Sequence, residues 1–217
     1  MLDLGAGTGA ATRAVVAAGG RCVAADVALG MLQAIDEPRP PSTVADARAL
    51  PVASGRLDGV VAAFSINHVS EPCGALLEAI RVVRAGSPLL VSAYAHDDSH
   101  PVKAAVDSAA AELGWHPDSW VADLRADSTP LLATVAGARR IATQAGLPDA
   151  CVELLEVPFP DLDAADLVAW RCGMAQVAPF VERLTGPERA RLHRRAAELL
   201  GTAPVLTRRM IAITAIV

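Results

Sequence analysis

The stretch Leu2-Asp3-Leu4-Gly5-Ala6-Gly7-Thr8-Gly9 decides the fold class, because it joins a short aliphatic strand to a glycine-rich turn. Residues 10–18 continue with a helical pattern, and Gly19-Gly20 closes it. A glycine-rich turn between a strand and a helix lets a ligand approach the backbone closely. We therefore expect a ligand at this turn, facing the amino terminus of the helix.

Short aliphatic runs alternate with helical patterns along the rest of the chain. Predicted strands cover residues 1–4, 21–25, 42–45, 57–64, 88–94, 151–157 and 210–217. Predicted helices cover residues 10–18, 30–35, 73–83, 101–113, 129–145, 164–183 and 187–200. Strand, helix and strand in repetition predict an α/β fold with a doubly wound, mostly parallel sheet.

Composition limits the classes of protein that this chain can belong to. Its 217 residues are 53% hydrophobic, which suits one globular domain with a sizeable core. The net charge of -5 argues against a nucleic-acid-binding protein, which usually carries a basic surplus. No apolar run is long enough to span a bilayer, and the polar turn near Met1 leaves no room for a signal peptide. The four cysteines form no C-x-x-C pair, so we expect reduced cysteines in a cytoplasmic protein.

Carboxylates and other polar residues stand where the predicted strands end. Asp3 lies inside the first strand, where an acid suits a ligand that carries an ammonium group. Asp26 closes the second strand, where a carboxylate can accept hydrogen bonds from both hydroxyls of a ribose. Asp46-Ala47 closes the third strand, in a position to bind an adenine amino group, and residues 65–69 follow the fourth. Helix capping by Asp26 and a solvated loop position for Asp46 are the structural alternatives.

These pieces, in this order, resemble the class I S-adenosylmethionine-dependent methyltransferases, in particular the small-molecule branch of the ubiquinone/menaquinone-biosynthesis type. The matching pieces are residues 2–9, Ala25-Asp26 with Gly30-Met31-Leu32, Ala45-Asp46-Ala47 with Leu50-Pro51, residues 57–69, and residues 78–86 with Leu89-Leu90-Val91. The resemblance covers residues 1–95. It implies a Rossmann-like sheet of seven strands with inserted helices and a C-terminal antiparallel strand pair.

The resemblance also implies a division of labour within a single domain of residues 1–217. Residues 1–95 would bind the cofactor, S-adenosylmethionine, and residues 96–217 would lie on the acceptor side. The implied cofactor-binding residues are Asp3, Gly5, Ala6 and Gly7 for the methionine end, Asp26 for the ribose, Met31, Asp46 and Ala47 for the adenine, and Ala63 to Ser65 below the sulfonium. Helices usually precede the glycine motif in such proteins, so we expect either a coding sequence that begins upstream of Met1 or an open site.

Candidates for the chemistry of methyl transfer follow the fourth and fifth strands. A base is needed only if the acceptor must lose a proton, and His68 or His96 stands in the right position to take it. Surface or capping histidines are the alternative. The run His96-Asp97-Asp98 lacks an identifiable further ligand, so we expect no metal. Apolar residues of the later helices are candidates for an acceptor pocket or for core packing, namely Trp115, Trp120, Trp170, Met174 and Phe180.

Two other functions remain open from the sequence. The turn also satisfies the dinucleotide pattern G-x-G-x-x-G/A, which would suit an NAD(P)-dependent oxidoreductase. Asp3 and Asp46 speak against that enzyme, and Tyr94, the only tyrosine, has Asp98 rather than a lysine four residues on. A non-catalytic relic that still binds S-adenosylmethionine is the other alternative. We expect a monomer or homodimer whose partner is a small-molecule methyl acceptor, since no Asn/Asp-Pro-Pro-aromatic motif for base methylation follows the fourth strand.

Overall fold

A computed structural model describes residues 1–117 and 129–217 of the chain. Its internal contacts separate two compact units. Unit 1 consists of Met1–His96, Arg125–Leu155 and Met210–Val217, and unit 2 of Asp97–Leu124 and Glu156–Arg209. Within the described ranges, no helix is long and apolar enough to cross a membrane.

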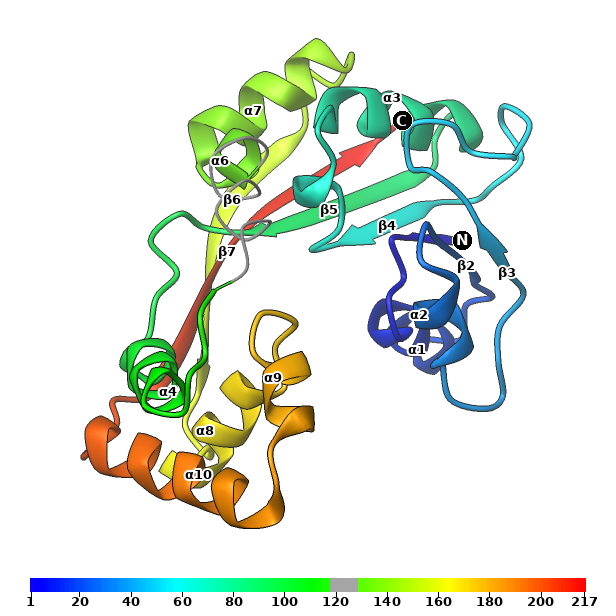
Figure 1. Cartoon of the computed structure of the whole chain (residues 1–217). Helices are drawn as coiled ribbons and strands as arrows, with labels where there is room; N and C mark the ends of the chain where they lie inside the picture. Colours follow the sequence, from blue (N-terminus) through cyan, green and yellow to red (C-terminus); the bar gives the residue numbers. More distant parts are fainter. Residues whose placement is uncertain (118–128) are drawn as a thin grey trace. The chain divides into compact units, whose positions relative to one another are not determined.

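A seven-stranded sheet organises unit 1 (Figure 1). Its strands are β1 (Leu2–Leu4), β2 (Val23–Asp26), β3 (Ser42–Val44), β4 (Val60–Ala63), β5 (Pro88–Tyr94), β6 (Cys151–Phe159) and β7 (Leu206–Ile216). They follow the order β3-β2-β1-β4-β5-β7-β6. The first five strands pair in parallel, and β7 pairs antiparallel with β5 from Pro88↔Ile216 to Tyr94↔Met210. The predicted fold class is therefore confirmed, with all seven strands in the expected regions.

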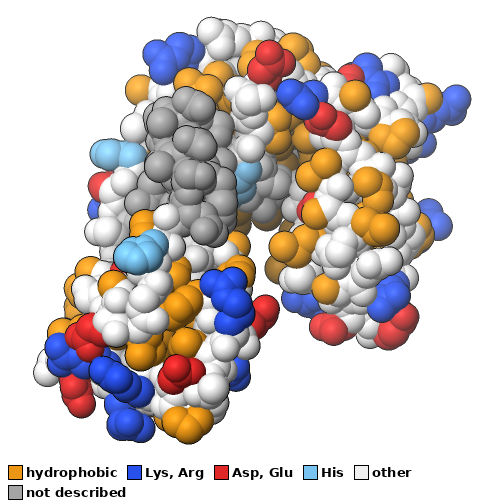
Figure 2. Space-filling view, viewed as in Figure 1, with side chains coloured by type: hydrophobic (Ala, Val, Ile, Leu, Met, Phe, Trp, Pro, Cys, Tyr) orange, Lys and Arg blue, Asp and Glu red, His pale blue; other side chains and the backbone are white. Residues whose placement is uncertain are grey.

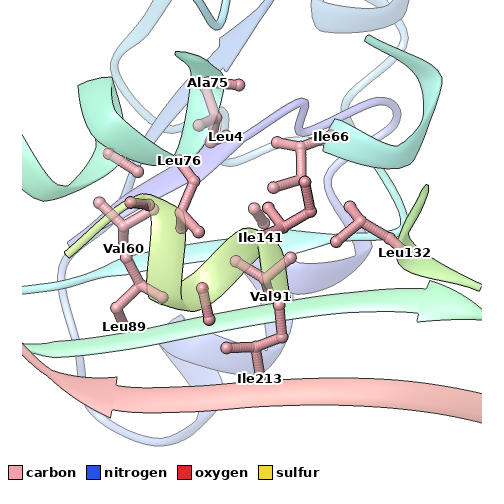
Figure 3. Packing of buried hydrophobic residues seen from close by; sticks show 14 of the residues in the cluster. Leu4, Val60, Ile66, Ala75, Leu76, Leu89, Val91, Leu132, Ile141 and Ile213 are labelled. Carbon is pink, nitrogen blue, oxygen red and sulfur yellow. The ribbon is translucent and has the colours of Figure 1, made fainter. Parts of the chain in front are cut away.

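The two faces of the sheet are covered by different helices. Helices α3 (Pro72–Val82) and α7 (Val135–Gln144) pack on one face, where apolar side chains of alternating strand positions form the main core. Figure 3 shows Leu76 and Ile141 pointing from these helices toward Val60, Val91 and Ile213 of the sheet. Helices α1 (Ala10–Ala17) and α2 (Leu29–Gln33) belong to the other face, where Ala6, Ala24, Leu32 and Ile35 form a small core.

The helices of unit 2 form a core of their own. They are α4 (Pro101–Ala111), α8 (Ala164–Cys172), α9 (Ala178–Arg183) and α10 (Gly186–Leu200). Helix α10 packs against α4 and α8 through buried side chains such as Leu192 and Ala196. Thr185 and Glu188 form a reciprocal capping box at the start of α10.

Two helices that were predicted as continuous are interrupted. Residues 129–145 form α6 (Thr129–Leu132) and α7, because Thr134 starts a new helix and accepts a hydrogen bond from the amide of Gly137 (3.0 Å). Residues 164–183 form α8 and α9, which restarts with Pro179 in its first turn. Proline suits the first turn of a helix but not its interior, where it removes a hydrogen bond.

Candidate functional site

The glycine-rich turn follows β1 and lies beside the end of β2. The amides of Gly5 and Ala6 both donate to the carbonyl of Ala25, at 2.8 and 3.0 Å. Gly5, Gly7 and Gly9 all have positive φ, at 70°, 54° and 83°. Residues with a Cβ rarely adopt such angles, so the three glycines allow the tight path from β1 into α1.

Asp26 braces this turn from the end of β2. One carboxylate oxygen accepts from the amide of Gly7 and the other from the amide of Ala28, both at 2.8 Å. A β-carbon at Gly7 would meet no described atom within 4 Å, so the backbone there borders open space. The turn is thus held from the side of Asp26 and open on the side of Gly7, which fits a ligand that lies against the backbone.

Asp3 caps helix α1 from the neighbouring strand. Its side chain is buried, and one oxygen accepts from the amide (2.8 Å) and the hydroxyl (2.7 Å) of Thr12. That amide is one of the free N–H groups of the first helical turn. Burial raises the pKa of Asp3, and the bonds from Thr12 offset part of this effect. The sequence had not singled out Thr12, which the helix brings to Asp3 from nine positions away.

The end of β4 turns sharply against Gly5. A β-carbon on Gly5 would lie 2.2 Å from Cβ of Ser65, and the Ser65 hydroxyl donates to the carbonyl of Leu4 at 2.6 Å. Phe64, just before Ser65, has a φ of 55°, the only positive φ of a non-glycine residue in the described ranges. Its ring stacks on Tyr94 at the end of β5, with centroids 4.3 Å apart. Ser65 therefore adjoins the turn. The stacked aromatic pair was not foreseen from the sequence.

The adenine-side candidates occupy the ends of β2 and β3. Met31 is exposed on α2, and Ala47 is half-buried beyond β3. Asp46 binds Arg48 through a short ion pair, with Nη2 and Oδ2 2.7 Å apart, and accepts from the Arg48 amide. The hydrogen bonds from Arg48 lower the pKa of Asp46 to about 2. A ligand that uses Asp46 would therefore compete with Arg48, a partner two residues away that the sequence had not indicated.

Both candidate bases are exposed, but their neighbours differ. His68 lies in the short 3₁₀ helix η1 (Ile66–His68) that follows β4, and desolvation by the surrounding protein lowers its pKa. Its Nε2 lies 3.4 Å from Nδ2 of Asn67, whose own Oδ1 is buried without a hydrogen-bond partner among the described residues. His96 is exposed just after β5, and its amide donates to the carbonyl of Ala133.

The acidic run after His96 makes ion pairs and hydrogen bonds within unit 2. Asp98 is buried in an ion pair with Arg208 (2.7 Å) and accepts from the amide of Arg209. His100 is buried and caps α4 by accepting from the amide of Val102. In the part of the chain that the structure describes, no three His, Cys, Asp or Glu side chains gather in a way that could hold a metal ion.

The apolar candidates for an acceptor pocket belong to the core of unit 2. Trp115 is buried there and donates from its indole to the carbonyl of Gln176 at 3.3 Å. Trp170 and Phe180 pack against the same cluster, and Arg208 lies over the Trp170 ring at 5.1 Å. Trp120 lies outside the described residues. Core packing therefore accounts for the tryptophans that the structure describes.

A cavity of about 990 Å³ lies at the opposite end of the sheet from the glycine turn. Val16 and Arg13 of α1, the segment from Ile35 to Pro41, and Leu57 before β4 contribute to its wall. Among the candidate site residues and their direct partners, only Thr12 borders it. In parallel α/β sheets ligands bind outside the carboxyl ends of the strands, so this cavity is not the place expected for the ligand of the glycine turn.

Comparisons with known proteins agree with this geometry. Residues 2–91 match the family described as a methyltransferase domain. The demethylmenaquinone methyltransferase of Renibacterium salmoninarum is 37% identical over 105 residues, which are 48% of this chain and 44% of that protein. The chain thus spans less than half the length of this curated relative. The resemblance found in the sequence is confirmed over this stretch.

Solved structures extend the likeness in fold to nearly the whole chain. A protein of an antibiotic biosynthesis pathway in Anabaena variabilis, assigned as a methyltransferase, has a TM-score of 0.61 and 17% identity, covering 97% of this chain and 88% of that one. Phosphoethanolamine N-methyltransferase 2 of Haemonchus contortus, in complex with S-adenosyl-L-methionine, has a TM-score of 0.58 and 15% identity, covering 100% and 48%. Residues 2–91 are thus similar in sequence to a methyltransferase domain, and the described fold is similar to that of solved methyltransferases.

Proposed function

We propose that the chain transfers a methyl group from S-adenosylmethionine to a small-molecule acceptor, by O- or C-methylation. The observation that carries this proposal is the turn at Gly5–Gly7, which Asp26 braces and which borders open space at Gly7. The family match over residues 2–91 includes this turn. When bound, S-adenosylmethionine supplies a methyl group on a positively charged sulfur.

The residues around the turn suit the parts of that molecule. The backbone at Gly7 borders open space, so the methionine end can approach the turn closely there. Asp26 ends β2 with a carboxylate whose oxygens are already oriented by two backbone amides, and it would accept from the ribose hydroxyls. Asp3 adds a second acidic side chain beside the turn, and its ionised form would favour a cationic ligand. Met31, Asp46 and Ala47 would contact the adenine.

A histidine would remove the acceptor proton where one must leave. We place His68 first, because it follows β4 directly, in the short helix η1 next to the glycine turn's neighbour Ser65. Asn67 contacts the ring and would limit its rotation. His96, beyond β5, is the second candidate. Alignment of the reactants supplies much of the acceleration in a direct displacement, so loss of the base would reduce turnover without abolishing it.

The relatives suggest which acceptors to test first. The curated relatives are demethylmenaquinone methyltransferases, so a demethylated quinol leads the panel. We propose a cytoplasmic protein, a monomer or homodimer, in which residues 1–217 act as one domain without a nucleic-acid partner. In support, Figure 2 shows Lys and Arg side chains interspersed with Asp and Glu on the face in view, without an unbroken basic stripe.

Calorimetric titration of the full chain tests the cofactor assignment. S-adenosylmethionine, S-adenosylhomocysteine and NADH are titrated in parallel, and we expect the two adenosyl ligands alone to bind. Asp26→Ala should weaken both by roughly 10- to 100-fold, since a charge-assisted hydrogen bond contributes about 1.5–3 kcal/mol. Asp161→Asn, a substitution at an exposed carboxylate of unit 2, is the matched control and should bind as the wild type does.

Each result separates the candidate functions. Binding of NADH alone would favour an oxidoreductase, and binding of none of the three would reject the proposal. Binding of S-adenosylmethionine without turnover on any acceptor of the panel would favour the non-catalytic relic.

A further inference from the structure

The chain holds Phe64 in a backbone conformation that a phenylalanine rarely adopts. Its φ is 55°, and a non-glycine residue there is strained by about 1–3 kcal/mol. Contacts on both sides fix the conformation. The Phe64 amide donates to the carbonyl of Ser92 on β5, and the next residue, Ser65, donates to the carbonyl of Leu4 on β1. Such strain persists only where the surrounding structure over-determines it, and it is typical of ligand-binding sites.

The strained turn places the Phe64 ring on the ring of Tyr94. The two rings are nearly parallel, 19° apart, and both side chains are half-buried. Strands β1, β4 and β5 are successive neighbours in the sheet, and neighbouring strands lie about 4.8 Å apart. The pair therefore stands at the carboxyl ends of the strands next to the glycine turn, roughly 5–10 Å from Gly5. This is the side on which Ser65 packs against Gly5 of the turn.

The surroundings of the pair favour a positive charge. Residues 2–9, 63–69 and 94–96, which form the ends of β1, β4 and β5, include no lysine or arginine. Asp3 and Asp26 contribute carboxylates at the same end of the sheet. The face of an aromatic ring carries negative charge density and attracts cations within about 6 Å of its centre.

We propose that the Phe64–Tyr94 pair recognises the positive charge of the ligand's sulfonium, an inference that rests on the proposed binding of S-adenosylmethionine. S-adenosylhomocysteine lacks the transferred methyl group and is neutral at the same sulfur. The pair therefore makes the site prefer the methyl donor to the product that remains after transfer. This preference favours release of the spent molecule and entry of a fresh donor.

Calorimetric titration of the full chain with both ligands tests this assignment through their ratio of dissociation constants. Tyr94→Leu and Phe64→Leu remove an aromatic face but keep an apolar side chain. We expect each to weaken S-adenosylmethionine by about 2- to 30-fold, the range for a cation–π contact, with S-adenosylhomocysteine changed by less than about twofold. Phe64→Gly is a third variant that suits the positive φ, so its fold is not endangered.

Tyr94→Phe is the matched control, because it retains the ring and should keep the wild-type ratio. Equal weakening of both ligands, or an unchanged ratio in all three ring-removing variants, would overturn the inference while leaving the proposed function intact. A wild-type chain that binds neither ligand would overturn the proposed function and the inference together.

Discussion

Gly5 and Gly7 share a positive φ but differ in what surrounds them, so Gly→Ala at each position separates two physical effects. At Gly7, φ is 54° and a β-carbon would meet open space. At Gly5, φ is 70° and the β-carbon would lie 2.2 Å from Cβ and 2.9 Å from Oγ of Ser65. Contacts under 3 Å force Ser65 to move, which breaks its hydrogen bond to Leu4.

The expected losses of stability follow from these contacts. A left-handed conformation costs a residue with a Cβ about 1–2 kcal/mol, so Gly7→Ala should lower the free energy of unfolding by that amount. Gly5→Ala adds about 1–3 kcal/mol for overpacking, for a total of about 2–5 kcal/mol. For a chain of this size the additional loss is equivalent to about 2–12 °C in Tm.

Urea and thermal unfolding followed by far-ultraviolet circular dichroism measure both variants. The double variant Gly5→Ala/Ser65→Gly removes the clash and should recover part of the loss, leaving the conformational cost and the missing hydrogen bond. Gly7→Ala should instead weaken S-adenosylmethionine binding, because its methyl group occupies the open side of the turn. Equal destabilisation by Gly5→Ala and Gly7→Ala, with no recovery in the double variant, would refute this account of the turn.

Three further predictions concern other buried or titrating groups. Thr12→Val removes a hydroxyl bond to the buried Asp3 and should destabilise the protein by about 1–3 kcal/mol at pH 7. The folded-state pKa of Asp3 is raised, so acid protonates Asp3 and removes the cost of burying its charge. Urea unfolding should therefore show a smaller loss of unfolding free energy for Thr12→Val at low pH than at pH 7. Arg208→Ala leaves Asp98 buried without its main partner and should cost about 3–5 kcal/mol, measured by tryptophan fluorescence in urea; a loss below 1 kcal/mol would contradict this. If His68 is the base, turnover should fall only as the pH drops below its lowered pKa, which is under the usual value of about 6.5, and His68→Ala should abolish that step in the pH–rate profile.

The sequence predicted the layers of unit 1 because local patterns encode them. Short aliphatic runs, separated by glycines and helical patterns, predicted the parallel strands. A parallel strand is buried on both faces, so a nearly continuous hydrophobic run is its sequence signal. The runs were long enough to place all seven strands, although β4 begins only at Val60. The breaks in the two later helices were missed because the cap at Thr134 and the helix start with Pro179 in its first turn lie within a continuous apolar pattern.

The residues of the glycine turn were also identifiable from local sequence patterns. Gly5 and Gly7 need positive φ whatever surrounds them, and Asp26 ends a strand that must lie beside the turn in a parallel sheet. The chemical partners of these residues were not identifiable. Arg48 forms an ion pair with Asp46, two residues away. A sequence pattern does not show whether two such side chains form an ion pair or point separately into solvent.

The sequence by itself determined the positions of the strands along the chain, the glycine turn and the acidic residues at the strand ends, because each depends on backbone conformation and hydrophobic periodicity within a short stretch. Only the tertiary structure decided how those residues are used. Asp3 caps a helix through Thr12, Gly5 accommodates Ser65, and Phe64 meets Tyr94 from a strand 30 positions away in the chain. These contacts join separate strands and helices, so their geometry is set by packing of the whole sheet and leaves no periodic signal in the sequence.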